Sequence, residues 1–176
     1  MTKKTTLYIV QAAAIAALYA TLTTAQALLI PGSTSMAVQF RVAEAMTILA
    51  FFTPVAIPGL TVGCILANIL GGLGPIDMVF GSLATLLAVS SMWMLRKLCV
   101  KGIPFVGLLM PAVFNGLIVG FEIEFFFVGQ MKTFNFADFL IQGGLVALGE
   151  VVVLFVLGIP LTMALKKHNL TKQLKG

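Results

Sequence analysis

The chain has 176 residues, of which 60% are hydrophobic and only 10% are charged, and its mean hydropathy is +1.09. Soluble domains carry about a quarter charged residues, so this composition excludes a water-soluble globule, and the scarcity of polar stretches excludes a disordered chain. Because a spanning helix needs about 20 apolar residues, the length accommodates roughly five to seven such helices in a single membrane domain, residues 1–176. The net charge of +5 comes from scattered cations and does not favour nucleic-acid binding.

Apolar runs broken by charged residues, proline and glycine predict an all-α membrane protein with six spanning helices. The first run covers residues 7–30 and ends before Pro31 and Gly32. The other five cover residues 38–52, 57–70, 76–95, 103–121 and 136–165. The second and third runs are short for a full crossing, so a hairpin of two half-buried helices is the alternative. The start of the chain also resembles a signal peptide, but its apolar run continues past the candidate cleavage site and is long enough to span.

The cations are distributed unevenly between the two ends of these helices. With a cytoplasmic N-terminus, nine of the 11 lysine and arginine residues lie on the cytoplasmic side, and Arg41 and Lys132 lie outside. Because cytoplasmic loops are enriched in Lys and Arg, both termini are predicted to be cytoplasmic. The nine residues are Lys3, Lys4, Arg96, Lys97, Lys101, Lys166, Lys167, Lys172 and Lys175.

Signatures of common catalytic and metal sites are missing from the sequence. It contains no phosphate-binding G-x-x-x-x-G-K-[ST] motif and no G-x-S-x-G nucleophile elbow. The one histidine, His168, lies in a basic tail and is interpreted as a solvated residue. Cys64 and Cys99 are far apart and form no CxxC pair. We therefore expect a transporter or binding protein, not an enzyme, with no cofactor and no metal.

Polar side chains recur at one depth, in the outer half of the predicted helices. At about 1.5 Å per helical residue, Arg41 and Glu44 lie roughly 5–10 Å below the outer surface, and Asn115 lies on the order of 10 Å below it. Such groups are costly in hydrocarbon, so a layer of them predicts a pocket that opens to the outside. The layer consists of Gln39, Arg41, Glu44, Asn68, Asp77 and Asn115.

Structural roles also explain these residues one by one. Arg41 and Glu44 are three apart and can neutralise each other, and Asp77 is favourable at a helix N-terminus. Asn68 and Asn115 can bridge helices by hydrogen bonding. The prediction of a binding site therefore depends on the depth that these residues share.

Two further features of the predicted helices have open interpretations. Glu150 lies near or below the membrane midplane, where a carboxylate needs a partner or a proton, so it serves either a structural hydrogen bond or proton coupling. The first helix carries a strip of small side chains that lets another helix approach closely, either within this chain or from an external partner. The strip consists of Ala12, Ala13, Ala16, Ala17 and Ala20.

Two elements of the sequence resemble the QueT family. They are VQFRVAEA at residues 38–45 and ANILGGLG at residues 67–74, the latter continuing through Asp77 to GSLAT at residues 81–85. The resemblance covers nearly the whole chain. It implies a six-helix substrate-binding (S) component of an energy-coupling factor (ECF) transporter in the bacterial cell membrane, with a queuosine precursor such as preQ0, preQ1 or queuine as ligand. It also implies that the alanine strip docks on the transmembrane subunit of an energy module with two ATPases.

The chemistry of a 7-deazaguanine suggests a role for each residue of the polar layer. Its guanine-like edge has adjacent N–H donors, which a carboxylate accepts in bidentate fashion, so Glu44 is the first candidate and Asp77 the second. The other site residues are expected to bond the carbonyl and ring nitrogens or, for the phenyl ring, to stack on the ligand, and they are Gln39, Phe40, Arg41, Asn68 and Asn115. The alternative function is a self-sufficient proton-coupled secondary transporter or channel that uses Glu150. A third hypothesis, an assembly factor without a ligand, predicts a polar layer filled by internal hydrogen bonds.

Overall fold

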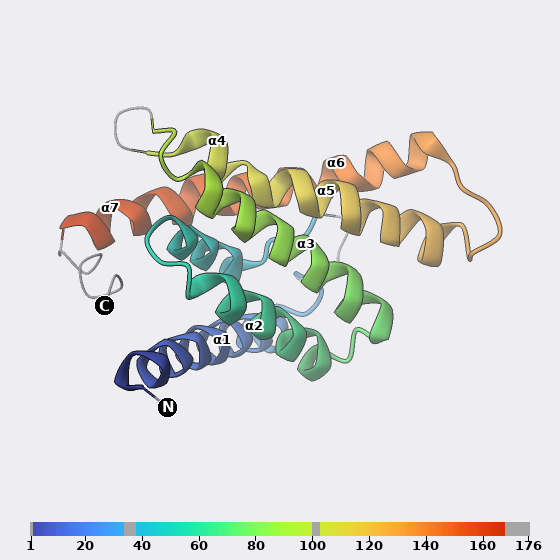
Figure 1. Cartoon of the computed structure of the whole chain (residues 1–176). Coiled ribbons are helices and arrows are strands. Elements are labelled where there is room, and N and C mark those ends of the chain that lie inside the picture. Colours follow the sequence, from blue (N-terminus) through green and yellow to red (C-terminus); the bar gives the residue numbers. More distant parts are fainter. Residues whose placement is uncertain (1, 34–37, 100–102, 168–176) are drawn as a thin grey trace.

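The computed structural model describes residues 2–33, 38–99 and 103–167, and these residues form helices with no β-strand. Figure 1 shows an elongated bundle in which the start of α1 and the end of α7 lie at the same end as the end of α3 and the start of α4. The predicted all-helical class is therefore confirmed. His168, Lys101, Lys172 and Lys175 lie outside the described residues.

Four helical segments of the described chain are long and apolar enough to cross a membrane. Two of them are single helices, α1 (Lys3–Leu29) and α3 (Pro75–Leu95). The other two are composite. One contains α4 (Phe105–Leu108), α5 (Met110–Glu122) and the π-helix η2 (Ile123–Val128). The other contains α6 (Phe136–Val153), the π-helix η3 (Leu154–Gly158) and α7 (Ile159–Lys167).

The second and third predicted spans are short helices in the structure. They are η1 (Val42–Phe51), a ten-residue 3₁₀ helix, and α2 (Ala56–Gly71), with 16 residues. At about 2.0 and 1.5 Å per residue, they measure about 20 and 24 Å, which is less than a hydrocarbon core of about 30 Å. The fifth predicted span was too short, because the helix continues past residue 121 to Val128.

The boundary between α2 and α3 follows from local sequence. Gly72 ends α2 with a φ of 65°, and Gly74 precedes α3 with a φ of 98°. Glycine adopts these left-handed conformations without a steric penalty. Pro75 then occupies the first position of α3, where its missing N–H costs nothing. This turn fixes the place at which Asp77 enters the bundle.

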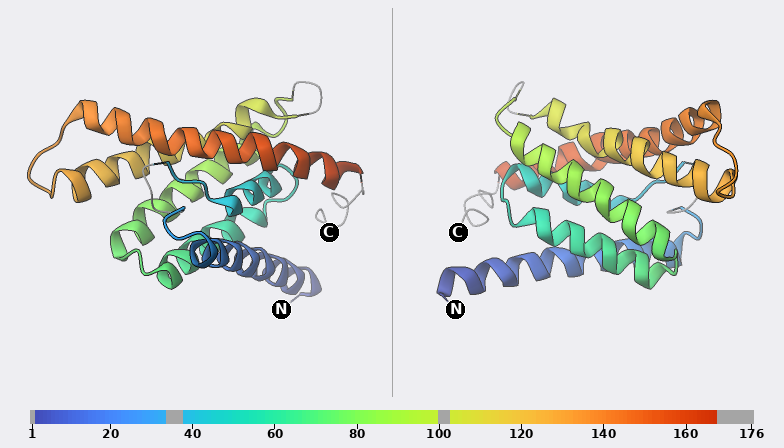
Figure 2. Two further views of the ribbon diagram at one scale, coloured as in Figure 1. Left: turned by 180° about the vertical axis from the view of Figure 1, so that it is seen from behind. Right: turned by 45° about the vertical axis from the view of Figure 1, so that its right-hand side comes forward.

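Glycines allow neighbouring helices to approach closely. A Cβ at Gly63 in α2 would lie 2.9 Å from the Tyr19 Cβ and 3.0 Å from the Ala16 carbonyl oxygen in α1. A Cβ at Gly120 in α5 would lie 2.6 Å from the Gly143 Cα in α6. The right-hand view in Figure 2 shows α3 between α2 and the α5–α6 pair, so α3 joins the two glycine-packed pairs.

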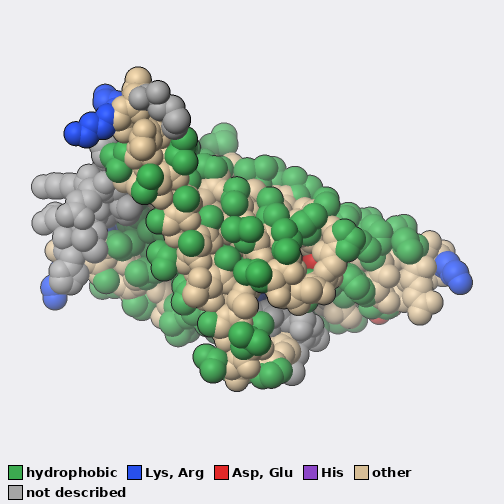
Figure 3. Space-filling model, turned by 90° about the horizontal axis from the view of Figure 1, so that it is seen from below, with side chains coloured by type: hydrophobic (Ala, Val, Ile, Leu, Met, Phe, Trp, Pro, Cys, Tyr) green, Lys and Arg blue, Asp and Glu red, His purple; other side chains and the backbone are tan. Residues whose placement is uncertain are grey.

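The surface is apolar along the bundle and basic at its ends. Leu, Val, Ile and Phe side chains from nearly every helix are exposed, as expected of a lipid-facing surface. Figure 3 shows hydrophobic side chains over most of one face and Lys and Arg at the two extremities. The start of α1, the end of α3 and the end of α7 bring six described basic residues to one end, whereas Lys132 lies in the loop at the other end. The six are Lys3, Lys4, Arg96, Lys97, Lys166 and Lys167.

Candidate functional site

Arg41 is the positive charge that acts on four acidic side chains from different elements. Its charge acts on Glu44 in η1, Asp77 in α3, Glu122 in α5 and Glu150 in α6. The side chains of Glu44, Glu122 and Glu150 are only 2%, 1% and 5% exposed, and Asp77 is partly buried. Buried charges persist only where they are paired, so these five residues, the Arg41 cluster, are the polar centre of the bundle.

The backbone that carries Arg41 is fixed between α1 and α6. Gln26 of α1 donates a hydrogen bond to the Phe40 carbonyl and accepts one of 2.8 Å from the Val42 backbone N–H. On the other side, a Cβ at Gly149 of α6 would lie 2.1 Å from the Gln39 carbonyl oxygen, so only glycine leaves room there. Arg41 therefore precedes η1 instead of lying on its helical face, which corrects the expected placement within the first turns of the second span.

Glu44 is held by a residue that sequence reasoning missed. The Tyr19 hydroxyl of α1 donates a hydrogen bond to Glu44 Oε1, and Tyr19 is fully buried. The second oxygen, Glu44 Oε2, has no hydrogen-bond partner. Tyr19 stands within the alanine strip of α1, and that single large polar side chain among small ones was the signal available in the sequence.

Glu150 has a partner that the sequence did not reveal. Asn115 Nδ2 of α5 donates a hydrogen bond of 2.8 Å to Glu150 Oε1 of α6, 35 residues away in the chain. Glu150 Oε2 is buried without a hydrogen-bond partner. Two of the predicted polar residues are thus joined across helices, while one carboxylate oxygen is still available to accept a hydrogen bond.

Asn68 links α2 to α3. Its amide Nδ2 donates a hydrogen bond of 2.8 Å to the Asp77 backbone carbonyl and lies 3.8 Å from Cys64 Sγ. A Cβ at Gly81 would lie 3.1 Å from the same nitrogen, so the amide is tightly enclosed. The amide nitrogen of Asn68 therefore has a structural role in positioning Asp77.

Glu122 belongs to the Arg41 cluster, although it is not part of the polar layer predicted from the sequence. Both of its carboxylate oxygens are buried and accept no hydrogen bond from an N–H or hydroxyl group, and its carboxyl group lies within hydrogen-bonding reach of the Asp77 carboxyl. The helices meet here, since the rings of Phe80 in α3 and Phe121 in α5 have centroids 6.1 Å apart. Asn115 and Glu122 are seven residues apart, two helical turns on one face, and that spacing could have identified Glu122.

Three other predicted site features lie differently in the structure. Phe40 is 42% exposed, in contrast to the buried members of the Arg41 cluster, and Gln39 is half-buried. Within the alanine strip, Ala16 and Ala20 are buried, whereas Ala13 and Ala17 are exposed. All five alanines of the strip line two shallow apolar grooves between α1 and α2, with volumes of about 290 and 530 Å³.

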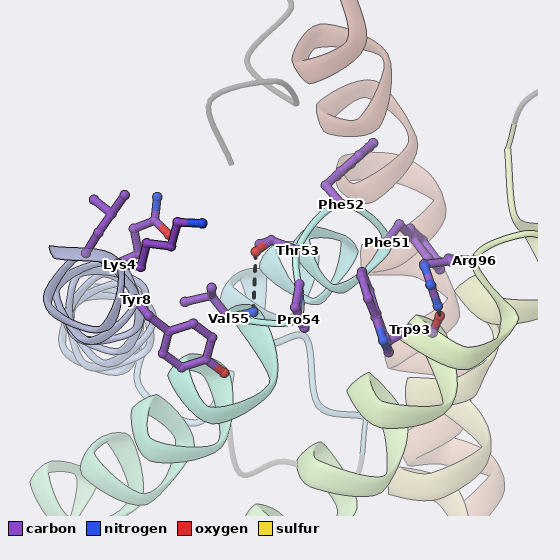
Figure 4. Close-up of a pocket in the computed structure, with 11 residues that line it drawn as sticks. Lys4, Tyr8, Phe51, Phe52, Thr53, Pro54, Val55, Trp93 and Arg96 are labelled. Atoms are coloured by element: carbon purple, nitrogen blue, oxygen red, sulfur yellow. Dashed lines mark hydrogen bonds between the residues drawn. The ribbon is translucent and has the colours of Figure 1, made fainter. Parts of the chain in front are cut away.

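A larger cavity of about 730 Å³ opens at the basic end of the bundle. Figure 4 shows Lys4 and Tyr8 of α1 on one side of it and Trp93 and Arg96 on the other, with the η1–α2 connection between them. The Arg96 guanidinium lies 3.6 Å from the centre of the Trp93 ring. Phe51, the last residue of η1, lines this cavity, so along η1 the cavity lies about 14 Å from Glu44 and about 20 Å from Arg41.

Four apolar helical segments and a buried charged centre define an integral membrane protein. Over residues 9–167 the chain matches the QueT transporter family, and it belongs to that family. It is 33% identical over 160 residues to the queuosine precursor transporter QueT of Lactococcus lactis subsp. cremoris, an alignment that covers 89% of this chain and 90% of that relative. No solved structure matches it. The resemblance found in the sequence is thus confirmed, and the protein is a membrane transporter of a small molecule.

Proposed function

We propose that this chain is the S component of an ECF-type importer and binds a queuosine precursor at the Arg41 cluster. The observation that carries the proposal is that the charge of Arg41 acts on four acidic side chains, three of them buried with carboxylate oxygens that accept no hydrogen bond from an N–H or hydroxyl group. The similarity to a protein named as a queuosine precursor transporter supports a 7-deazaguanine as the ligand. In this proposal the chain binds the ligand from outside the cell and delivers it to the cytoplasm together with an ATP-driven energy-coupling module.

The available hydrogen-bonding groups match a guanine-like ligand. Glu44 Oε2 has no partner and can accept the adjacent N–H donors of the guanine edge while Tyr19 holds the other oxygen. Asp77 is the second candidate acceptor. Arg41 donates to the ligand carbonyl or sets the charge state of Glu44, while Gln39, Phe40, Asn68 and Asn115 complete the proposed pocket.

The proposed topology has six membrane-embedded helical segments with both termini in the cytoplasm. The six described basic residues gathered at one end support this orientation through the positive-inside rule. The 730 Å³ cavity then faces the cytoplasm, so it does not serve capture from outside. The helices of residues 42–51 and 56–71 are each too short to cross the membrane. We propose that the residues connecting them also lie within the membrane.

The energy module is proposed to dock on the two apolar grooves between α1 and α2. Ala13 and Ala17 are the exposed members of the alanine strip and allow close approach of a partner helix. Ala13→Leu and Ala17→Leu should abolish ATP-dependent uptake in proteoliposomes that contain the whole transporter, yet leave ligand binding by the purified chain unchanged. Leu18→Ala, at an exposed position of the same helix outside both grooves, is the matched control. Uptake that survives both substitutions contradicts this docking surface.

Replacement of Glu44 by glutamine tests the ligand site directly. Glu44→Gln keeps the size of the side chain but replaces one charged acceptor oxygen with a donor, so affinity for a 7-deazaguanine in detergent should fall roughly tenfold or more. Asp138→Asn, in the first turn of α6, serves as the control because Asp138 lies outside the Arg41 cluster. Unchanged affinity of Glu44→Gln removes this residue from the site.

A self-sufficient proton-coupled transporter is the second candidate, favoured by the buried Glu150 with one unpartnered oxygen. Proteoliposomes that contain the purified chain alone distinguish the two functions. Uptake driven by a proton gradient supports the second candidate. Binding without uptake supports the S component.

A further inference from the structure

We propose that Asp77 and Glu122 form a subsite for a protonated amine, so that the ligand is a 7-deazaguanine with an aminomethyl-type side chain instead of a neutral nitrile. This inference rests on the proposed function, because it names which part of the ligand the pair holds. Among the precursors considered, preQ1 and queuine carry such an amine, and preQ0 carries a nitrile.

The unused acceptor capacity of Glu122 is the observation that carries the inference. Glu122 is 1% exposed, and its carboxyl group lies within hydrogen-bonding reach of the Asp77 carboxyl but accepts no hydrogen bond from an N–H or hydroxyl group. An ionised carboxylate accepts about four hydrogen bonds, so burial against a second carboxyl group, with no N–H or hydroxyl donor, carries a large desolvation cost. An ammonium group supplies three donors and a positive charge, which is what this carboxylate lacks.

Each of the neighbouring buried carboxylates already accepts a hydrogen bond from a protein donor. Glu44 accepts from Tyr19, Glu150 accepts from Asn115, and Glu124 accepts a hydrogen bond of 2.8 Å from the Asn135 backbone N–H. Glu122 is therefore the buried carboxylate of this region whose only hydrogen-bonding neighbour is another carboxyl group, that of Asp77.

Asp77 supplies the second wall of the proposed subsite. It opens α3, and its position is set by the Asn68 hydrogen bond to its carbonyl and by the contact of Phe80 with Phe121 next to Glu122. Asp77 is only partly buried, so the pair has one enclosed and one accessible member. A ligand amine can reach such a pair from the accessible side.

The charge balance of the cluster favours a cation over a neutral group. Arg41 is one positive charge, and its field acts on four carboxyl groups. Two carboxylates side by side in a low-dielectric interior repel each other, and an ammonium group between them replaces that repulsion with two attractions. A nitrile offers neither a donor nor a positive charge, so it leaves the pair uncompensated.

Comparison of preQ1 and preQ0 binding to the full-length chain in detergent tests the proposal. Isothermal titration at constant pH and salt should show preQ1 binding roughly tenfold or more tightly than preQ0. Glu122→Gln should lower preQ1 affinity by about 10- to 100-fold and change preQ0 affinity by less than about threefold. Asp138→Asn is again the control and should change neither affinity.

The outcomes separate this inference from the proposed function. Equal affinities of the wild-type chain for preQ1 and preQ0, or equal losses for both ligands in Glu122→Gln, overturn the amine subsite but not the S-component assignment. Absence of binding by every 7-deazaguanine overturns the proposed function itself. Asp77→Asn provides a second variant with the same expected loss of selectivity, in case Glu122→Gln fails to give a monodisperse protein on gel filtration.

Discussion

A single methyl group at Gly149 should dislodge the segment that carries Arg41. The Cβ of an alanine at this position would lie 2.1 Å from the carbonyl oxygen and 2.9 Å from the carbonyl carbon of Gln39. Ordinary contact begins at 3.4 Å, so the Gln39 backbone must move by more than an ångström. Backbone atoms cannot rotate away as a flexible side chain does, and the displacement passes directly to Arg41.

The size of the effect follows from overpacking. Forcing an extra methyl group into a filled interior costs about 1–3 kcal/mol, whereas replacing a helical glycine by alanine without a clash gains up to about 1 kcal/mol. A Cβ at Gly144 in the same helix would meet no atom within 4 Å, so this glycine is the matched control. Gly149→Ala and Gly144→Ala should therefore change stability in opposite directions.

Thermal unfolding in detergent and ligand titration measure the two consequences of Gly149→Ala. The unfolding midpoint should fall, and affinity for the ligand should fall with it, because Arg41 and the adjacent Gln39 shift. Gly144→Ala should leave both quantities equal to or above their wild-type values. A Gly149→Ala protein with wild-type stability and affinity refutes the close packing of residues 39–41 against α6.

Three other predictions concern packing and topology. Tyr19→Phe removes the donor to Glu44 and should cost about 1–3 kcal/mol in unfolding free energy, so an unchanged midpoint contradicts that hydrogen bond. Gly63→Val should lower the midpoint by separating α1 from α2, at a cost of about 1–3 kcal/mol, and a wild-type midpoint argues against this glycine contact. In a chain whose native cysteines are replaced by serine, an impermeant maleimide applied to whole cells should label Lys132→Cys and not Lys97→Cys, and the reverse pattern inverts the topology.

Spacing in the sequence was sufficient to locate the long helices. The runs predicted at 76–95 and 136–165 agree within two residues with Pro75–Leu95 and the Phe136–Lys167 segment. The 3₁₀ form of Val42–Phe51 was not predictable, because α and 3₁₀ helices share composition and differ through tertiary contacts. The extension of the fifth helix into η2 was not predicted, because Glu122 and Glu124 interrupt the apolar run after Phe121.

Part of the Arg41 cluster could be predicted from the depth of its residues along the helices. The rest could not, because the sequence does not show which way a side chain points around the helix axis. Arg41, Glu44 and Asp77 were selected because their distance from the helix ends is readable from the chain. The sequence did not predict that the side chains of Tyr19 and Glu122 point into the bundle. In a membrane protein both the lipid-facing side and the interior are apolar, so hydrophobic periodicity does not show which face points inward.

The dispersed origin of the Arg41 cluster has a consequence for assembly. Its acidic members come from η1, α3, α5 and α6, which are spread from Glu44 to Glu150 along the chain. Neither the first nor the second half of the polypeptide therefore contains all of the proposed ligand-binding groups. A ligand bound to these groups would contact segments that are far apart in the sequence. Ligand binding should therefore stabilise the whole bundle against unfolding and not just one local region.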